Sequence, residues 1–117
     1  MTNRFKNFTE DELACPHCLS RGVTDEAGKL LQTLREELDR PLRINSAYRC
    51  PIHNEAVGGV SGSKHLLGTA FDISTRAKDW TVADKARLYE VAKSVGFKGF
   101  GHYRTFLHID TGPEREW

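Results

Sequence analysis

The sequence predicts an α+β domain in which helices flank a small antiparallel sheet. Two long helical patterns and several short strand patterns follow one another without a regular strand–helix–strand repeat, and this mixture is typical of the α+β class. The length of 117 residues corresponds to one domain. We therefore expect a single domain over residues 1–117, with a short helix and a Cys-x-x-Cys loop in residues 1–23 and a tail in residues 111–117.

The first helices are predicted from capping residues and from the period of the apolar positions. Thr9 and Glu12 have the spacing of a capping box and begin a short helix. Thr24 is the expected N-cap of a longer helix that runs to about Asp39 and is ended by Pro41. The apolar positions of this helix repeat with a helical period and are expected to face the core: Ala27, Leu30, Leu31, Leu34 and Leu38.

Two further helices are expected along the chain. A short one lies at about 52–57 and ends at two consecutive glycines. A long one spans 81–95, because Thr81 and Asp84 have the spacing of a second capping box and Gly96 follows the last turn. Its expected apolar stripe consists of Val82, Ala86, Leu88 or Tyr89, and Val95.

Strands are expected at 42–46, at 69–74 and within 97–110. The last segment is rich in glycine and aromatic residues and is predicted to form one or two strands of a hairpin. Successive residues of a strand point to opposite faces. Asp72 and His108 therefore lie on polar faces, and the apolar residues on either side of each point into the opposite layer.

His65, Asp72 and His108 are the donor set of a catalytic zinc site, in which three protein ligands leave a fourth position to water or substrate. Donor atoms must lie about 2 Å from the ion, whereas a seven-residue separation spans roughly 10.5 Å in a straight helix and roughly 23 Å in a straight strand. The chain between His65 and Asp72 must therefore bend. Gly68 is the expected bend, because glycine adopts φ > 0 without penalty. Pairing of the two strands would then bring the three donors together.

The three cysteines are an odd number and do not form a disulfide framework. Cys15-x-x-Cys18 and Cys50-x-x-His53 together match the ligand spacing of a Cys₃His structural zinc site, which would staple the N-terminal segment to the region before the candidate active site. Reduced thiols and a Cys15–Cys18 redox pair are the alternatives. A nucleophilic Cys50 is disfavoured by its position in a Cys-Pro-x-His turn.

Charge and composition exclude several function classes. The balance of 17 basic against 16 acidic residues gives no electrostatic case for nucleic acid or an anionic membrane. The longest apolar runs are too short for a transmembrane helix. The N-terminus lacks the apolar stretch of a secretory signal peptide, so we expect synthesis in the cytoplasm, and we expect a monomer.

The motifs resemble those of the M15 family of zinc peptidases, which includes D-alanyl-D-alanine carboxypeptidases and phage endolysins. The matching positions, in the order of the family, are Ser46-Ala-Tyr-Arg49, Asn54 with Gly58-Gly59, Ser63-x-His65-x-x-Gly68-x-Ala70-x-Asp72 and His108-x-Asp110. The resemblance implies the fold that this family shares with the hedgehog signalling domain. It also implies that His65, Asp72 and His108 bind zinc and that Arg49 binds substrate near the metal.

The substrate that the resemblance implies is the peptide stem of bacterial peptidoglycan, cleaved at D-Ala-D-Ala or at L-Ala-D-Glu. A guanidinium at Arg49 can clamp a substrate carboxylate or stabilise the oxyanion of a tetrahedral intermediate. Ser63 and Tyr48 are further candidates for substrate binding. Together with the N-terminal composition, the resemblance leads us to expect a phage or prophage endolysin that acts on the cell wall after release at lysis.

Thr105 departs from the family pattern. Many M15 peptidases carry an acidic general base three positions before the last zinc-binding histidine, and a threonine hydroxyl cannot take a proton at neutral pH. The role could pass to Asp110 or His102, although Asp110 could instead accept the N–H of a ligand histidine and fix its tautomer. The alternative function is therefore a zinc-binding module that binds the cell wall or builds a phage particle with little or no catalysis.

Overall fold

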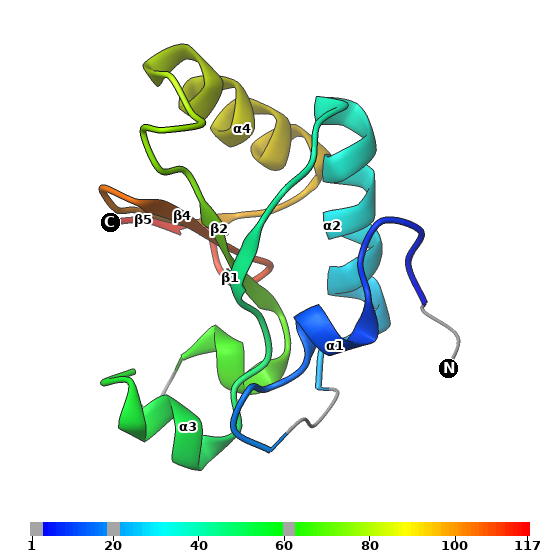
Figure 1. The fold of residues 1–117 in the computed structure, drawn as a ribbon, viewed down its shortest axis with the longest axis vertical. Coiled ribbons are helices and arrows are strands. Elements are labelled where there is room, and N and C mark those ends of the chain that lie inside the picture. The colour runs from blue at the N-terminus through cyan, green and yellow to red at the C-terminus, as the bar shows by residue number, and fades with distance from the viewer. Residues whose placement is uncertain (1–3, 19–21, 60–62) are drawn as a thin grey trace.

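The computed structural model describes residues 4–18, 22–59 and 63–117, and it shows helices packed on a five-stranded sheet (Figure 1). The elements follow the chain in the order α1 (Glu10–Leu13), α2 (Asp25–Leu38), β1 (Ile44–Ser46), α3 (Pro51–Ala56), η1 (Lys64–Leu67), β2 (Ala70–Ser74), α4 (Val82–Val95), β3 (Gly99–His102), β4 (Phe106–Asp110) and β5 (Arg115–Glu116), where η1 is a 3₁₀ helix. The predicted α+β class is confirmed. Within these residues no helix is long and apolar enough to cross a membrane.

The sheet has the strand order β1-β2-β4-β3-β5. Its neighbouring strands are antiparallel except β3 and β5, which are parallel. The expected antiparallel sheet is therefore a mixed one, because the tail adds a parallel edge strand. Three backbone hydrogen bonds hold that edge: the N–H of His102 donates to the carbonyl of Trp117 at 2.8 Å, the N–H of Trp117 donates to the carbonyl of Phe100 at 3.0 Å, and the N–H of Arg115 donates to the carbonyl of Lys98 at 3.2 Å.

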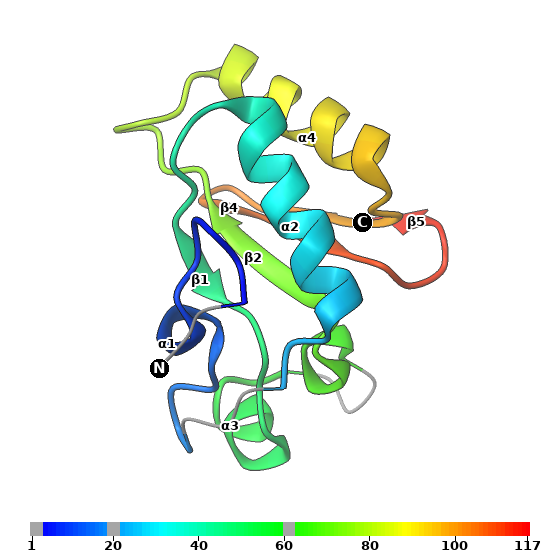
Figure 2. The same ribbon diagram turned by 90° about the vertical axis from the view of Figure 1, so that its right-hand side faces the viewer.

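Helices α2 and α4 pack against each other and cover one face of the sheet (Figures 1 and 2). The apolar residues of β2 and β4 join the side chains of both helices in one hydrophobic core; its members from these four elements include Leu31, Leu34, Phe71, Ile73, Leu88, Ala92, Leu107 and Ile109. Since strand residues alternate between faces, the residues between these apolar positions point away from the helices. The second face of the sheet is thus left for polar side chains.

The capping residues begin the helices where the sequence predicts. The hydroxyl of Thr9 accepts the N–H of Glu12 at the start of α1, and that of Thr24 accepts the N–H of Ala27 at the start of α2. Thr81 and Asp84 form the second capping box, at the start of α4. The end of α2 comes at Asp39, which adopts a left-handed φ of 52° before Pro41 is reached.

The apolar stripe predicted for α4 is wrong in its first half. Val82 is 84% exposed and Ala86 is also exposed, whereas Leu88 and Ala92 are the buried residues of this helix. At 100° per residue, Val82 and Ala86 lie roughly 120° and 160° around the helix from Leu88. A hydrophobic side chain alone therefore did not identify the buried face.

Gly68 provides the predicted bend between η1 and β2. It has a φ of 71°, its N–H donates to the carbonyl of His65 at 3.2 Å, and its carbonyl accepts the N–H of Thr24 at 3.0 Å. A Cβ at this position would collide with the backbone of Gly22. The turn that carries His65 toward β2 therefore requires glycine both for its φ and for the close approach of another segment.

We expect the Gly68→Ala substitution to lower the free energy of unfolding by roughly 2–4 kcal/mol, from left-handed strain plus overpacking. Gly58→Ala is the matched control, because Gly58 also has a positive φ of 75° but a Cβ there meets nothing within 4 Å. This control should lose only about 1 kcal/mol. Urea denaturation of both variants measures the difference, and equal losses would contradict the packing role of Gly68.

Candidate metal centre

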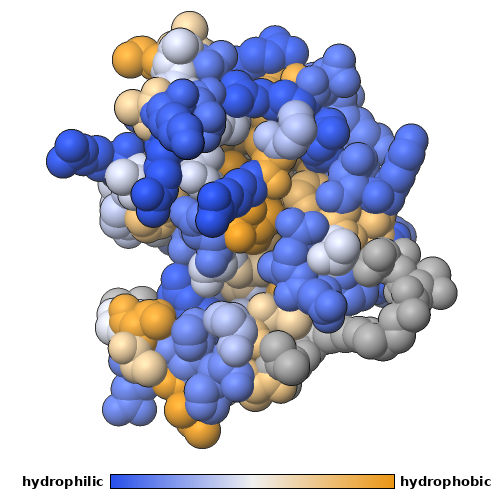
Figure 3. Space-filling view, viewed as in Figure 1, coloured by the Kyte–Doolittle hydropathy of each residue, from blue (hydrophilic) through white to orange (hydrophobic). Residues whose placement is uncertain are grey.

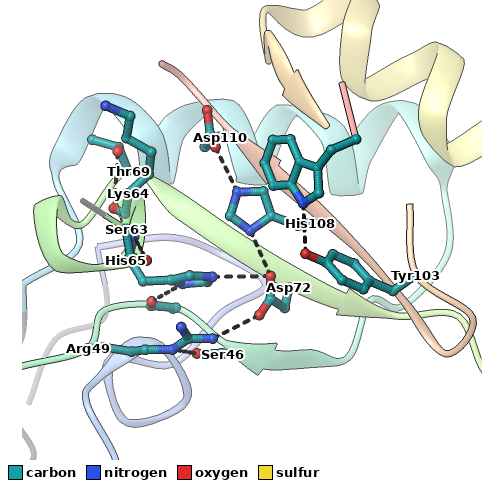
Figure 4. Close-up of polar contacts among 12 residues, drawn as sticks. Ser46, Arg49, Ser63, Lys64, His65, Thr69, Asp72, Tyr103, His108 and Asp110 are labelled. Carbon is teal, nitrogen blue, oxygen red and sulfur yellow. Dashed lines mark hydrogen bonds and ion pairs between the residues drawn. The ribbon is translucent and has the colours of Figure 1, made fainter. Parts of the chain in front are cut away.

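The three predicted donors converge on the sheet face that points away from α2 and α4. Asp72 of β2 and His108 of β4 are direct cross-strand partners, and His65 reaches them from η1 (Figure 4). Oδ1 of Asp72 lies 3.1 Å from Nε2 of His65 and 3.0 Å from Nδ1 of His108. A tetrahedral zinc ion with bonds of about 2.1 Å separates its nitrogen and oxygen ligands by roughly 3.4 Å. The donor set therefore fits zinc with shifts of a few tenths of an ångström.

Each imidazole directs a nitrogen without hydrogen toward this centre when it is neutral. Nδ1 of His65 lies 2.6 Å from the carbonyl of Ala47, which only accepts hydrogen bonds, so the hydrogen must sit on Nδ1. Nε2 of His108 lies 2.7 Å from Oδ2 of Asp110, which places the hydrogen on Nε2. These two acceptors fix the tautomers that metal binding needs.

Asp110 is fully buried and makes four hydrogen bonds. Besides His108, it accepts the backbone N–H of Gly112 at 2.9 Å and two guanidinium N–H groups of Arg115 at 2.8 and 3.0 Å. Burial by itself would raise the pKa of Asp110, but His108 and Arg115 hold that pKa well below its usual range. A buried carboxylate with occupied oxygens favours the role of orienting His108 over that of a general base.

Asp72 is only 6% exposed. Burial would raise its pKa, but in the metal-free protein the hydrogen bonds and positive charge that His108 and His65 supply lower the pKa of Asp72 to about 2. Arg49 adds a guanidinium N–H at 3.1 Å from Oδ2 of Asp72. Burial would likewise lower the pKa of His108, but the carboxylates of Asp110 and Asp72 raise it above its usual value.

Arg49 is held in place by two further side chains. Its Nε donates to the hydroxyl of Ser46 at 3.0 Å, and its Nη1 lies 3.3 Å from Oδ1 of the buried Asn54. Both contacts come from residues that flank Arg49 in the sequence. Arg49 therefore has a fixed guanidinium plane next to Asp72 (Figure 4).

The centre lies in a cleft of about 630 Å³. Figure 3 shows the molecule hollowed between the lobe that contains α3 and the rest of the fold. The lining residues include Arg49 and Ser63, two of the predicted substrate-binding residues, and His65, Asp72 and His108. The other described lining residues are Gly58, Gly59, Lys64, Tyr103, Phe106, Pro113, Arg115 and Trp117.

Two predicted site residues lie elsewhere. Tyr48 packs against the hydrophobic core with its ring over Gly22. His102 pairs with Leu107 across the hairpin, so alternation puts it on the face opposite to His108. There its Nε2 lies 2.9 Å from Oε1 of Glu116. His102 therefore lies on the other face of the sheet from the metal donors. The proton-transfer role expected of it stays a prediction.

The tail supplies residues that the sequence analysis missed. Arg115 binds Asp110, and the ring of Trp117 lies 5.0 Å from that of His108 while its indole N–H donates to the hydroxyl of Tyr103 at 2.7 Å. Residues 111–117 have no periodic pattern, and their contacts depend on how β5 pairs. The sequence alone therefore identified this segment only as a tail.

The lowered pKa of Asp72 predicts how the stability of the metal-free protein changes with pH. A carboxyl group whose pKa is lower in the folded state stabilises the fold above its unfolded pKa and loses this contribution as pH falls. We expect the parent to lose about 2 kcal/mol through this group between about pH 4 and pH 2, on top of other groups. Denaturant titrations in chelator should show a shallower decline for Asp72→Asn, and parallel curves would contradict the assignment.

Comparison with known proteins identifies the family. A family model described as Peptidase M15 matches residues 6–110. The zinc D-Ala-D-Ala carboxypeptidase of Streptomyces albus G is 29% identical over 89 residues, which make up 74% of this chain and 34% of that protein, so the chain spans about a third of the length of this relative. The family model covers nearly the whole chain, and His65, Asp72 and His108, a group that could hold a metal ion, lie within the matched residues; the chain belongs to the peptidase M15 family.

Proposed function

We propose that this chain is a zinc-dependent peptidase that hydrolyses the stem peptides of peptidoglycan. One observation carries the proposal: His65, Asp72 and His108 converge at an open cleft, with both imidazoles oriented to present nitrogens without hydrogen. Such a three-ligand centre leaves room for water or substrate, which is typical of catalytic rather than structural zinc. Membership of a peptidase family supports hydrolysis of a peptide bond.

The cofactor that we propose for this centre is one zinc ion, held by His65, Asp72 and His108. When bound, zinc supplies Lewis acidity, since it polarises a carbonyl and lowers the pKa of a water molecule. Asp110 holds the ring of His108, and the carbonyl of Ala47 holds the ring of His65. A second ion at the cysteine cluster would be structural, and separate contacts support it.

The charge of the cleft supports a substrate with carboxylates. Arg49, Lys64 and Arg115 line it, and Asp72 is the one acid among the described lining residues. Stem peptides carry free carboxylates, and a guanidinium can bind these bidentately. The name of the Streptomyces albus G relative favours cleavage at D-Ala-D-Ala, with L-Ala-D-Glu as the alternative bond. Arg49 would bind the substrate carboxylate or the developing oxyanion.

The endolysin role remains part of the proposal. A phage or prophage lysis enzyme would be made in the cytoplasm as a monomer and would meet peptidoglycan after release. The resemblance to a family that includes phage endolysins supports this role, and the cationic cleft is compatible with a cell-wall substrate. Clearing of a suspension of purified cell walls by added protein would test the lytic role separately from hydrolysis of the peptide bond.

We expect zinc-loaded protein to cleave soluble stem pentapeptides and purified peptidoglycan, and we expect chelation to abolish the reaction. His65→Ala and Asp72→Ala should each lose at least about 10³-fold in rate, because the stabilisation by zinc amounts to several kcal/mol. Mass spectrometry gives the product: loss of one alanine identifies carboxypeptidase action, and release at L-Ala-D-Glu identifies endopeptidase action. Full activity in either alanine variant would disprove the ligand assignment.

The lack of a second acidic residue among the described lining residues of the cleft favours a second candidate function, a cell-wall-binding or structural phage module with little catalysis. Thr105, at the family position of the general base, is exposed, and its carbonyl accepts the N–H of Thr75 at 2.9 Å. Among the described lining residues only Asp72 is acidic, and it is a metal donor. Such a protein would bind zinc and stem peptide without turnover.

Thr105→Asp separates the two functions, with Thr105→Asn as the uncharged control. If the chain is an active peptidase, we expect the Asp variant to stay within a few-fold of the parent, because proton transfer already proceeds without an acid there. A parent without measurable turnover and an Asp variant at least about 10²-fold faster would favour the binding module. Peptide hydrolysis, measured alongside peptide affinity, provides both readouts.

A further inference from the structure

We infer that the chain has a second, structural zinc site, formed by Cys15, Cys18 and Cys50 and completed by the imidazole of His17. This cluster lies outside the cleft, where the segment after α1 meets the start of α3 (Figures 1 and 2). The inference does not depend on the proposed peptidase activity. It concerns a different set of residues and a different role for the ion.

The sulfur atoms have the arrangement of a metal site. The three Sγ atoms all lie within 4.8 Å of one another, and none is joined in a disulfide. A tetrahedral zinc ion with Zn–S bonds of about 2.3 Å separates its sulfur ligands by roughly 3.8 Å. Three thiols from two distant segments meet closely enough to bind one ion, and their odd number does not suit disulfides alone.

The structure favours His17 over His53 as the fourth ligand. Nδ1 of His17 lies 3.5 Å from Sγ of Cys50. A tetrahedral zinc ion separates a nitrogen from a sulfur ligand by roughly 3.5 Å, which equals this distance. His53, expected from the Cys-x-x-His spacing, instead stacks its ring on that of His17 at 6.5 Å between centroids.

Backbone groups support two of the sulfurs as thiolates, the form that binds zinc. The N–H of Cys50 donates to Sγ of Cys15 at 3.4 Å, and the N–H of His53 donates to Sγ of Cys50 at 3.4 Å. Both sulfurs belong to buried residues. Cys18 and His17 are exposed, so an ion can enter from solvent.

An ion at this site would hold in place the loop that contacts the donors of the catalytic centre. Residues 47–50 supply the carbonyl of Ala47 to His65 and the guanidinium of Arg49 to Asp72, and this loop ends at Cys50. Among the described residues, one weak backbone hydrogen bond, from the N–H of Tyr48 to the carbonyl of Leu13 at 3.4 Å, joins the loop to the end of α1. An ion between Cys15 and Cys50 would add a strong link at this junction, which suits a small domain.

Metal content per chain tests the inference. The parent, after zinc loading and removal of loose metal, should hold about two ions, and Asp72→Ala should hold about one. Adding Cys50→Ser to Asp72→Ala should remove the remaining ion. A single ion in the parent that is lost in Asp72→Ala and retained in Cys50→Ser would overturn the inference.

A second measurement avoids variants that fail to fold. In Asp72→Ala with all cysteines intact, bound cobalt(II) should show the intense ligand-to-metal charge-transfer absorption of thiolate ligands. The thiols should react with a thiol reagent only after chelation. Immediate reaction of all thiols in the zinc-loaded protein, or a disulfide found by mass spectrometry, would overturn the inference.

His17→Ala and His53→Ala form the matched pair for the fourth ligand. In the Asp72→Ala background, we expect His17→Ala to weaken zinc binding by at least about 10-fold, as measured by chelator competition. His53→Ala should bind zinc like its parent. The reverse order would assign the fourth position to His53 and overturn the placement of His17.

Discussion

The pairing of Asp72 with His108 across β2 and β4 is the constraint on which the rest of the structure depends. In an antiparallel pair, residues directly opposite each other point to the same face. The neighbours Phe71 and Leu107 must then point to the other face, where α2 and α4 cover them. A slip of one residue would send the metal donors into the core and the apolar residues into the cleft. One register thus specifies both the hydrophobic core and the metal centre.

Burial of the carboxylates of Asp72 and Asp110 on these two strands costs free energy unless each is paired with a hydrogen-bond donor or a positive charge. Asp72 is surrounded by two imidazoles and the guanidinium of Arg49, and Asp110 by His108 and Arg115. Among the described residues, no buried side-chain nitrogen or oxygen lacks a partner. The tail is therefore part of the centre, because Arg115 provides the charge that lets Asp110 stay ionised beneath His108.

Local chemistry made much of this structure predictable. Capping threonines set three helix starts, and strand alternation placed Asp72 and His108 on the correct face. Prediction failed where a residue's surroundings come from distant segments. The exposure of Val82 depends on which side of α4 meets α2, and the contacts of Trp117 depend on a parallel pairing with β3 that no local pattern encodes. The proton-transfer role expected of His102 stays a prediction, because its pairing with Leu107 puts it on the face opposite to His108.

The loop of residues 47–50 contacts both the three converging donors and the cysteine cluster. The carbonyl of Ala47 orients His65, the guanidinium of Arg49 contacts Asp72, and the sulfur of Cys50 meets that of Cys15. His65 itself comes from a turn that requires Gly68, while Asp72 and His108 are placed by strand pairing. The position of the His65 ring therefore depends on its contact with this loop, and the positions of the other two donors depend on the sheet. A second ion bound at Cys50 would hold the end of this loop. It would thereby restrict the motion of His65 and Arg49 without contacting the reacting atoms.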